Sequence, residues 1–155
     1  MLAALQPRTA ENLTDLWAAL QRTALIVVHD CEVHYLTAMA LAADDDLAAH
    51  LLLKKLRIAH KATGSDFDRG IARMNSYVEF SHGDADERFC QIVHPSAPNR
   101  PSYGMGVTSL VGAGLIGLRS GQSILWPGED GLLSNLHVVH VENGAGVGKW
   151  LEAAI

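Results

Sequence analysis

Several features that commonly reveal a protein's function are scarce or absent in this chain of 155 residues. It has two cysteines, Cys31 and Cys90, which form neither a C-x-x-C pair nor a disulfide framework, so we expect two free thiols in a reducing compartment. No apolar run reaches the roughly 18 to 20 residues of a membrane span, and the N-terminus lacks the compact apolar region of a signal peptide. The sequence therefore predicts a cytoplasmic protein without a membrane partner.

Basic residues are also sparse and never form a block. The chain has 12 Lys and Arg against 17 Asp and Glu, which gives a formal net charge of -5 and a pI of about 5.8. A dedicated nucleic-acid binder would need a basic patch or stripe, so we expect no direct sequence-specific binding of nucleic acid. An acidic protein can still dock on a basic or mixed protein surface.

Hydrophobic residues, in contrast, make up 48% of the chain, which is enough to bury the core of one domain with an appendage. Apolar residues at helical spacing predict an additional N-terminal helix over 9–21, and the β-branched segment 24–28 predicts extended backbone. Two further helices, over about 31–43 with Asp30 as N-cap and over about 46–62, would form an αα-hairpin.

The second helix of this hairpin has acid at its start and base at its end, which suits the helix dipole. Its C-terminal half contains Lys54, Lys55, Arg57 and Lys61, and Gly64 follows as a C-terminal cap. The apolar residues expected to face inward are Val33, Leu36, Ala40 and Leu41 of the first helix, and Leu47, Leu51, Leu52, Ile58 and Ala59 of the second.

After a polar linker at 63–73 the pattern changes to the period of strands. The expected strands are 75–81, 87–94, 107–109, 123–126 and 132–141. Val78 and Phe80 should share one face of the first strand, and the glycine-rich segment 111–118 predicts one short helix that packs close to the sheet. The fold class is therefore α+β, with an N-terminal helical hairpin (a short antiparallel coiled coil) followed by an antiparallel sheet with one short helix.

Three short motifs follow one another in this second half of the chain. They are Met74-Asn75-Ser76 before the first strand, Val93-His94-Pro95 at the end of the return strand, and Ser109-Leu110-Val111-Gly112 at the start of a segment that continues to Gly117 and then Gly121-Gln122. In this order they resemble the C-terminal domain of the Gre transcript-cleavage factors, and in particular their short-armed relatives, the regulators of nucleoside diphosphate kinase. The resemblance covers residues 74–142, and more loosely 24–73.

The resemblance implies an FKBP-like domain over 74–143, preceded by an extra helix (1–22) and by the hairpin with its linker (23–73), and followed by a tail (144–155). It implies a non-enzymatic regulator that binds RNA polymerase near its secondary channel, competes with Gre factors and affects nucleoside diphosphate kinase indirectly. The polymerase-binding residues by resemblance are Thr108, Ser109, Leu110, Val111 and Gly112.

Two positions depart from the family pattern. Leu110 stands where the family has proline, and Gln122 stands where it has aspartate. We expect these two differences to affect the contacts with RNA polymerase that the resemblance implies, and to leave the fold unchanged.

Asp44, Asp45 and Asp46 would lie at the tip of the hairpin arm. Gre factors carry acidic residues at the tip of a longer coiled coil, where they help to hold a catalytic Mg²⁺. At 1.5 Å per residue the two expected helices are only about 20 and 25 Å long, too short to reach the polymerase active site. We therefore expect the aspartates to cap a helix rather than bind metal, and we expect no transcript cleavage.

Other chemistries have weaker support in the sequence. His137 and His140 should face opposite sides of a strand, and His29 and His34 lack a third ligand, so neither metal nor cofactor is expected. One open alternative is an interaction module that no longer binds polymerase, with helix 9–21 supporting weak self-association. Another is a prolyl isomerase, for which an FKBP-like fold offers the precedent. Its candidate aromatic residues are Tyr77, Phe80, Phe89, Tyr103 and Trp126, of which alternation assigns Phe80 and Trp126 to the core.

Overall fold

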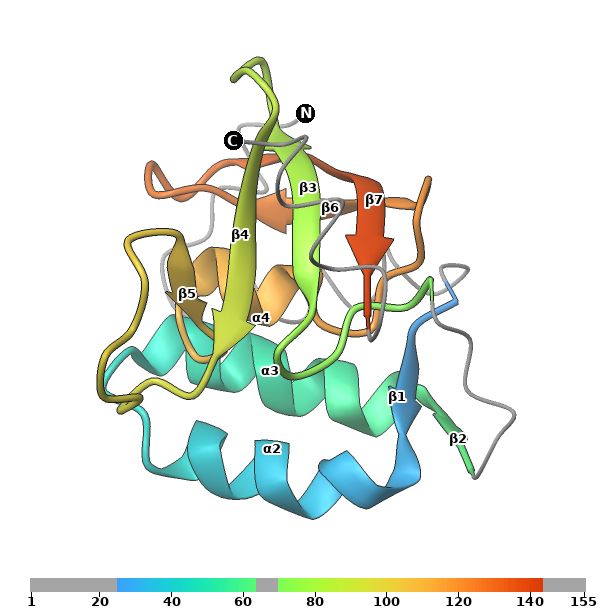
Figure 1. Cartoon of the computed structure of the whole chain (residues 1–155), viewed down its shortest axis with the longest axis vertical. Coiled ribbons are helices and arrows are strands. Elements are labelled where there is room, and N and C mark those ends of the chain that lie inside the picture. The colour runs from blue at the N-terminus through green and yellow to red at the C-terminus, as the bar shows by residue number, and fades with distance from the viewer. Residues whose placement is uncertain (1–24, 64–69, 144–155) are drawn as a thin grey trace, which may run out of the picture.

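The computed structural model of the chain describes residues 25–63 and 70–143 (Figure 1). The helix predicted over 9–21, most of the linker and the tail at 144–155 lie outside the described residues. Within them the fold is α+β, as expected, and a small helical part packs against a five-stranded sheet. No helix in these two ranges is long and apolar enough to cross a membrane.

The helical part is closed at its base by a pair of short strands. Its elements are β1 (Val27–His29), the 3-10 helix η2 (Asp30–Glu32), α2 (Val33–Leu41), α3 (Asp46–Ile58) and β2 (His60–Ala62). β1 and β2 pair in parallel, with Val27 opposite His60, so the two ends of the hairpin meet.

The predicted helix ends are wrong in two places. The first helix opens with the 3-10 turn, and His29 rather than Asp30 is its cap, because the His29 ring nitrogen Nδ1 accepts from the backbone N–H of Cys31 at 3.2 Å. The second helix ends at Ile58 and not near 62, because the N–H of His60 donates to the carbonyl of Ile26 at 2.7 Å and begins strand β2. The C-cap of α3 is Ala59, and Gly64, the predicted cap, lies outside the described residues.

The sheet consists of β3 (Tyr77–His82), β4 (Arg88–Val93), β5 (Gly104–Gly106), β6 (Ser123–Pro127) and β7 (Leu133–Glu142), in the order β5-β4-β3-β7-β6. It is mixed rather than wholly antiparallel, because β5 runs parallel to β4. The strand expected at 107–109 lies instead at 104–106, and 107–109 form the turn into helix α4 (Leu110–Leu115), where the N–H of Ser109 donates to the carbonyl of Gly106.

The core lies between the sheet and the helices, with α4 between α3 and the sheet (Figure 1). Val78 and Phe80 are fully buried on the inner face of β3, as their alternation predicts. Leu41 and Ile58, expected to face inward, are 73% and 43% exposed. The buried face of α2 is Leu36, Met39 and Ala40, and Leu41 lies about 100° further round the helix from Ala40.

Gly114 allows α4 to lie directly against the sheet. A Cβ atom at this position would lie 2.7 Å from both the Nε1 atom of Trp126 and a methyl carbon of Leu136. The expectation that the glycines of this segment permit close packing on the sheet is confirmed at Gly114.

A β-bulge changes which side chains of β7 share a face. Opposite β3, His137 pairs with Ser81 and His140 pairs with Glu79, because the register shifts between Glu79 and Phe80. Ser81 and Glu79 are two apart and share the outer face, so both histidines lie on that face. The prediction that these histidines face opposite sides is wrong for this reason.

Candidate functional site

The docking segment expected by resemblance, 108–112, forms the turn from β5 into α4. Ser109 is the N-cap of this helix, since its Oγ accepts from the N–H of Gly112 at 3.2 Å and donates to the carbonyl of Gly106 at 2.6 Å. Gly112 lies so close to β5 that a Cβ atom there would be 2.1 Å from the Gly106 oxygen. The serine and the glycine therefore set the path of the turn together, while Thr108 is buried and Val111 half-buried beside them.

Leu110 occupies the first helical position of α4. Proline is favoured at this position because its missing N–H would have no partner within the helix. The backbone of Ser109 is extended (φ -73°, ψ 161°), which is the conformation that a following proline requires. Leucine at 110 thus keeps the geometry of a Ser-Pro pair, and its side chain packs half-buried against the core.

Lys55 is the main site residue that the sequence pattern does not reveal. The pattern places it among the surface cations, whereas its side chain is 0% exposed. Its Nζ atom donates to the backbone carbonyls of Ala113 at 3.0 Å, Gly114 at 2.6 Å and Ile116. One signal was present in the sequence, because Lys55 falls within the buried stripe of α3 formed by Ala48, Leu51, Leu52 and Leu56.

The environment of Lys55 acts on its charge in two ways. Burial lowers the pKa of the Lys55 amine well below its ordinary value of 10.5. The three carbonyls lie at the C-terminal end of α4, where the helix itself leaves acceptors without donors and its dipole is negative. An ammonium has one N–H for each of these carbonyls, so α3 supplies the C-terminal cap of α4.

Trp126 of β6 holds the other end of the same helix. Its indole Nε1 donates to the carbonyl of Leu110 at 2.7 Å, and its ring centre lies 5.3 Å from the Lys55 Nζ. Helix α4 is thus attached to α3 at its C-terminal end and to the sheet at its N-terminal end.

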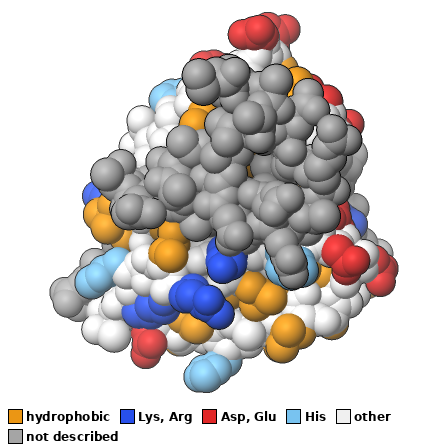
Figure 2. Space-filling view, turned by 180° about the vertical axis from the view of Figure 1, so that it is seen from behind, with side chains coloured by type: hydrophobic (Ala, Val, Ile, Leu, Met, Phe, Trp, Pro, Cys, Tyr) orange, Lys and Arg blue, Asp and Glu red, His pale blue; other side chains and the backbone are white. Residues whose placement is uncertain are grey.

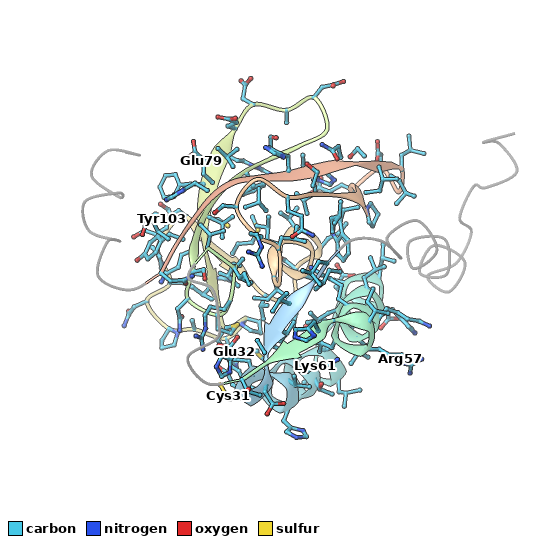
Figure 3. The ribbon with its side chains drawn as sticks, turned by 90° about the vertical axis from the view of Figure 1, so that its right-hand side faces the viewer. Cys31, Glu32, Arg57, Lys61, Glu79 and Tyr103 are labelled. Carbon is cyan, nitrogen blue, oxygen red and sulfur yellow. The ribbon has the colours of Figure 1, made fainter. Side chains whose placement is uncertain are left out.

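The other cations of the second hairpin helix are at least partly exposed. They are Lys54, Arg57 and Lys61, of which Lys61 lies in β2 rather than in α3. Figure 2 shows Lys and Arg side chains gathered on the back of the molecule over the helical part. In Figure 3, Arg57 and Lys61 lie on the helical part, at α3 and β2, whereas Glu79 and Tyr103 lie away from it.

At the arm tip, Asp45 is the N-cap of α3, with its Oδ1 accepting from the N–H of Ala48 at 3.0 Å. The expectation that an aspartate caps this helix is confirmed for Asp45. Asp44 and Asp46 are exposed beside it. In the described part of the chain, no group of three or more His, Cys, Asp or Glu side chains could hold a metal ion.

The structure brings the arm tip and the docking segment to one groove with a volume of about 590 Å³. Asp44 and Asp45 line it from the α2–α3 turn, and Thr108 and Ser109 line it from the turn into α4. Leu110, Val111 and Gly112 are not among its lining residues. In Figure 1 the α2–α3 turn lies beside the loop between β4 and β5.

Gln122, the second departure from the family pattern, makes two hydrogen bonds through its side-chain amide. Its Oε1 accepts from the N–H of Arg119 at 2.9 Å, and its Nε2 donates to the carbonyl of Leu25 at 2.7 Å. An aspartate could accept the first bond but could not donate the second. Gln122 therefore links the loop after α4 to the segment before β1 by a hydrogen bond that an aspartate could not make.

The Met74-Asn75-Ser76 motif forms a tight turn before β3. Asn75 has a positive φ of 71°, which asparagine tolerates better than most residues. The hydroxyl of the fully buried Ser76 accepts from the N–H of Arg73 at 2.8 Å and donates to Asn143 at 2.5 Å. The motif thus fixes the entry into the sheet.

The aromatic residues considered for a prolyl isomerase are divided between the two faces of the sheet. Phe80 and Trp126 are fully buried in the core, as alternation predicts. The ring of Tyr103 lies 5.3 Å from that of Phe89 and 6.1 Å from that of Tyr77. None of these five residues lines the groove beside the docking segment.

Comparison with known proteins gave both sequence and structural relatives. No family model matches the chain. One sequence relative is the Escherichia coli (strain K12) protein named Regulator of nucleoside diphosphate kinase. It is 30% identical over 95 residues, which cover 61% of this chain and 70% of that protein. The Shigella flexneri protein of the same name gives the same values. The structure of the prokaryotic transcription elongation factor GreA/GreB from Nitrosomonas europaea superposes with a TM-score of 0.58 at 21% identity, covering 77% of this chain and 98% of that one. That likeness establishes a shared fold.

Proposed function

Because this chain belongs to the family of regulators of nucleoside diphosphate kinase, we propose that it is a transcription regulator that binds RNA polymerase near its secondary channel. It competes there with Gre factors, in the cytoplasm, and influences nucleoside diphosphate kinase indirectly. The sheet and α4 form an FKBP-like domain in this proposal, and the domain provides the docking surface.

The observation that carries the proposal is the intact geometry of the docking turn. Ser109 caps α4, and Leu110 occupies the position where the family's proline fits without loss of a hydrogen bond. Lys55 and Trp126 fix both ends of the helix that follows. The departure at Leu110 therefore changes the side chain that a partner meets, and it leaves the shape of the turn unchanged.

We further propose that the protein acts without catalysis and does not promote transcript cleavage. Helices of 9 and 13 residues are only about 14 and 20 Å long at 1.5 Å per residue. Asp45 is already engaged as a helix cap, and α3 packs against α4 instead of standing free. A hairpin of this length would leave the acidic tip far from the polymerase active site.

Binding is tested by size-exclusion chromatography of the chain with and without core RNA polymerase, followed by titration of a fluorescent derivative. We expect co-elution, displacement by a Gre factor, and weaker binding of Ser109→Ala. Ser123→Ala removes an exposed hydroxyl on β6, away from the turn, and serves as the matched control. Failure of the folded wild-type chain to bind at micromolar concentration would reject the proposal.

The absence of cleavage is tested separately with stalled elongation complexes. We expect the length of the labelled RNA to stay the same after the protein is added, while a Gre factor in a parallel reaction shortens it. RNA shortening that is lost in Asp44→Asn would show that the arm tip is catalytically active.

A second candidate function is a protein-interaction module that no longer binds RNA polymerase. Leu110 and Gln122 favour this second function, because both differ from the family motif. The side chain of Gln122 is also occupied by a hydrogen bond to the carbonyl of Leu25. The same chromatography distinguishes the two functions, since only the first predicts co-elution with polymerase.

A further inference from the structure

We propose that the C-terminal segment 144–155 folds back onto the outer face of the sheet and packs Trp150 against three aromatic rings there. The rings are those of Tyr77, Phe89 and Tyr103, and they are called the ring cluster below. This surface is distinct from the turn into α4, and the inference is independent of the proposed binding to polymerase. It gives the outer face of the sheet an occupant from the chain itself.

The ring cluster lies on the face of the sheet that points away from the core. Val78 and Phe80 face the core, so alternation along β3 turns Tyr77 outward. The ring centroid of Tyr103 lies 5.3 Å from that of Phe89 and 6.1 Å from that of Tyr77. In Figure 3, Tyr103 lies away from the helical part. Rings from β3, from β4 and from the residue before β5 thus meet on one outer face.

The ring cluster is a surface on which a further aromatic side chain can pack. Its three residues are half-buried, so part of each side chain is still accessible. Aromatic rings that meet edge to face or offset gain stability beyond the area that they bury. A ring from another segment is therefore a better cover for this surface than an aliphatic side chain.

The C-terminal segment begins beside the ring cluster. In the pairing of β3 with β7, Tyr77 lies opposite Glu142, the last residue of β7. Asn143, the next residue, is held in place by Ser76, whose Oγ donates to its Oδ1 at 2.5 Å. The point at which the segment leaves the sheet is thus fixed close to Tyr77.

The segment is long enough to return across the outer face. Neighbouring strands lie about 4.8 Å apart, so the three steps from β7 through β3 and β4 to β5 cover roughly 15 Å. The seven residues from Asn143 to Trp150 can span up to about 23 Å when extended. Gly144, Gly146 and Gly148 lie in this stretch and permit the turn that a change of direction needs.

The composition of the segment also suits the ring cluster. Its larger apolar residues, Val147, Trp150, Leu151 and Ile155, fall at i, i+3, i+4 and i+8, which places them on one side of a helix. Trp150 is the one aromatic residue in this segment. It is therefore the side chain that we assign to the ring cluster.

The other terminal segment, 1–24, enters the described fold near the opposite edge of the sheet. The carbonyl of Leu25 accepts from the Nε2 of Gln122 at 2.7 Å, and Gln122 directly precedes β6. Strand β6 is the edge strand farthest from β5. The C-terminal segment therefore has the shorter path to the ring cluster.

The first test detects the contact directly in the full-length chain by nuclear magnetic resonance. We expect nuclear Overhauser effects between the indole protons of Trp150 and the ring protons of Phe89 or Tyr103, with Trp150→Phe used to assign the indole signals. Their absence in the folded chain would overturn the inference. Effects from Trp17 in place of Trp150 would assign the ring cluster to the N-terminal segment and would also overturn it.

A sample that mixes isotope-labelled with unlabelled chains distinguishes contacts within one chain from contacts between two chains. We expect the effects to arise within one chain. Effects that appear between labelled and unlabelled chains alone would assign the ring cluster to a second copy of the protein and overturn the inference.

The second test is a double-mutant cycle measured by urea denaturation. Trp150→Ala and Phe89→Ala should each raise the equilibrium constant for unfolding by about tenfold. The double variant should raise it by clearly less than the roughly hundredfold expected of independent effects, because each single variant already removes the contact between the two rings.

Leu132→Ala provides the matched control for this cycle. Leu132 is 60% exposed in the turn between β6 and β7, away from the ring cluster, so its effect should simply multiply with that of Trp150→Ala. If the effects of Phe89→Ala and Trp150→Ala multiply in the same way, the two rings are not in contact and the inference is overturned.

Discussion

The Nζ atom of Lys55 lies 2.6 Å from the carbonyl oxygen of Gly114, and this contact joins the hairpin arm to the helix that follows the docking turn. Two more carbonyls, those of Ala113 and Ile116, accept from the same amine. A short helix of six residues has little stability of its own, so its position depends on such external contacts. Lys55 therefore positions α4, the helix that follows the turn proposed to bind polymerase.

Replacement of Lys55 should destabilise the fold through the carbonyls it leaves behind. Lys55→Met keeps a flexible chain of similar length but removes the amine donors of the three carbonyls, and a buried acceptor without a donor costs about 1 to 3 kcal/mol. We expect a loss of about 2 kcal/mol or more in the free energy of unfolding, measured by urea denaturation. Lys54→Met, one residue away and partly exposed, should change it by less than about 0.5 kcal/mol. Equal effects of the two variants would contradict the role assigned to Lys55.

The same amine should make the stability of the fold depend on pH. Burial lowers the pKa of Lys55 in the folded chain, so between that pKa and 10.5 the unfolded chain binds more protons than the folded chain. The free energy of unfolding should therefore rise with pH through this window.

The measurement compares wild type with Lys55→Met from about pH 7 to about pH 10, so that all other titrating groups cancel. The difference in free energy of unfolding should grow in favour of the wild type as the pH rises. A difference that stays flat would mean that the three carbonyls hold the ammonium charged throughout the range.

Restoring the family's proline should be tolerated. In Leu110→Pro the ring falls at the first helical position after an extended Ser109, and among the described residues the N–H of Leu110 donates no hydrogen bond that would be lost. We expect a change of less than about 1 kcal/mol in the free energy of unfolding and tighter binding to core polymerase.

Ala113→Pro provides the contrast within the same helix. The N–H of Ala113 donates to the carbonyl of Ser109 at 2.8 Å, so proline there should cost about 3 kcal/mol. If Leu110→Pro unfolds the chain as readily as Ala113→Pro, the assignment of 110 as the first position of the helix is incorrect.

The two thiols should differ sharply in reactivity. Cys31 is exposed in the 3-10 turn, whereas Cys90 is buried in β4, and burial raises the pKa of the Cys90 thiol to about 12. Iodoacetamide at neutral pH should modify the native chain once, at Cys31, and should modify both residues in denaturant. Mass spectrometry of the two samples, with Cys31→Ser as the control, identifies the site, and native labelling of Cys90 would contradict its burial.

The parts of the fold that the sequence predicts well are those with local causes. Alternation in β3 places Val78 and Phe80 inside, and the turn residues between β3 and β4 set the hairpin. The cap by Asp45 is equally local, because it involves an N–H three residues further along the chain.

The features that the sequence does not predict have partners far away in the chain. Helix α3 stops at Ile58 because His60 bonds to Ile26, and helical periodicity continues past that point. Lys55 looks like a surface cation until Ala113, Gly114 and Ile116 are placed beside it. The β-bulge that puts His137 and His140 on one face is likewise a product of strand pairing.

The closure of the hairpin base by β1 and β2 makes the arm a modular insertion in the fold. Val27 and His60 meet in register, so the two ends of the hairpin lie side by side while its helices pack on the core. Whole turns added on both sides of the α2–α3 connection would lengthen the arm while the contacts of Lys55 with α4 stayed fixed. The length of the hairpin can therefore change between related proteins without a change in the paired strands β1 and β2 or in the contacts that hold α4.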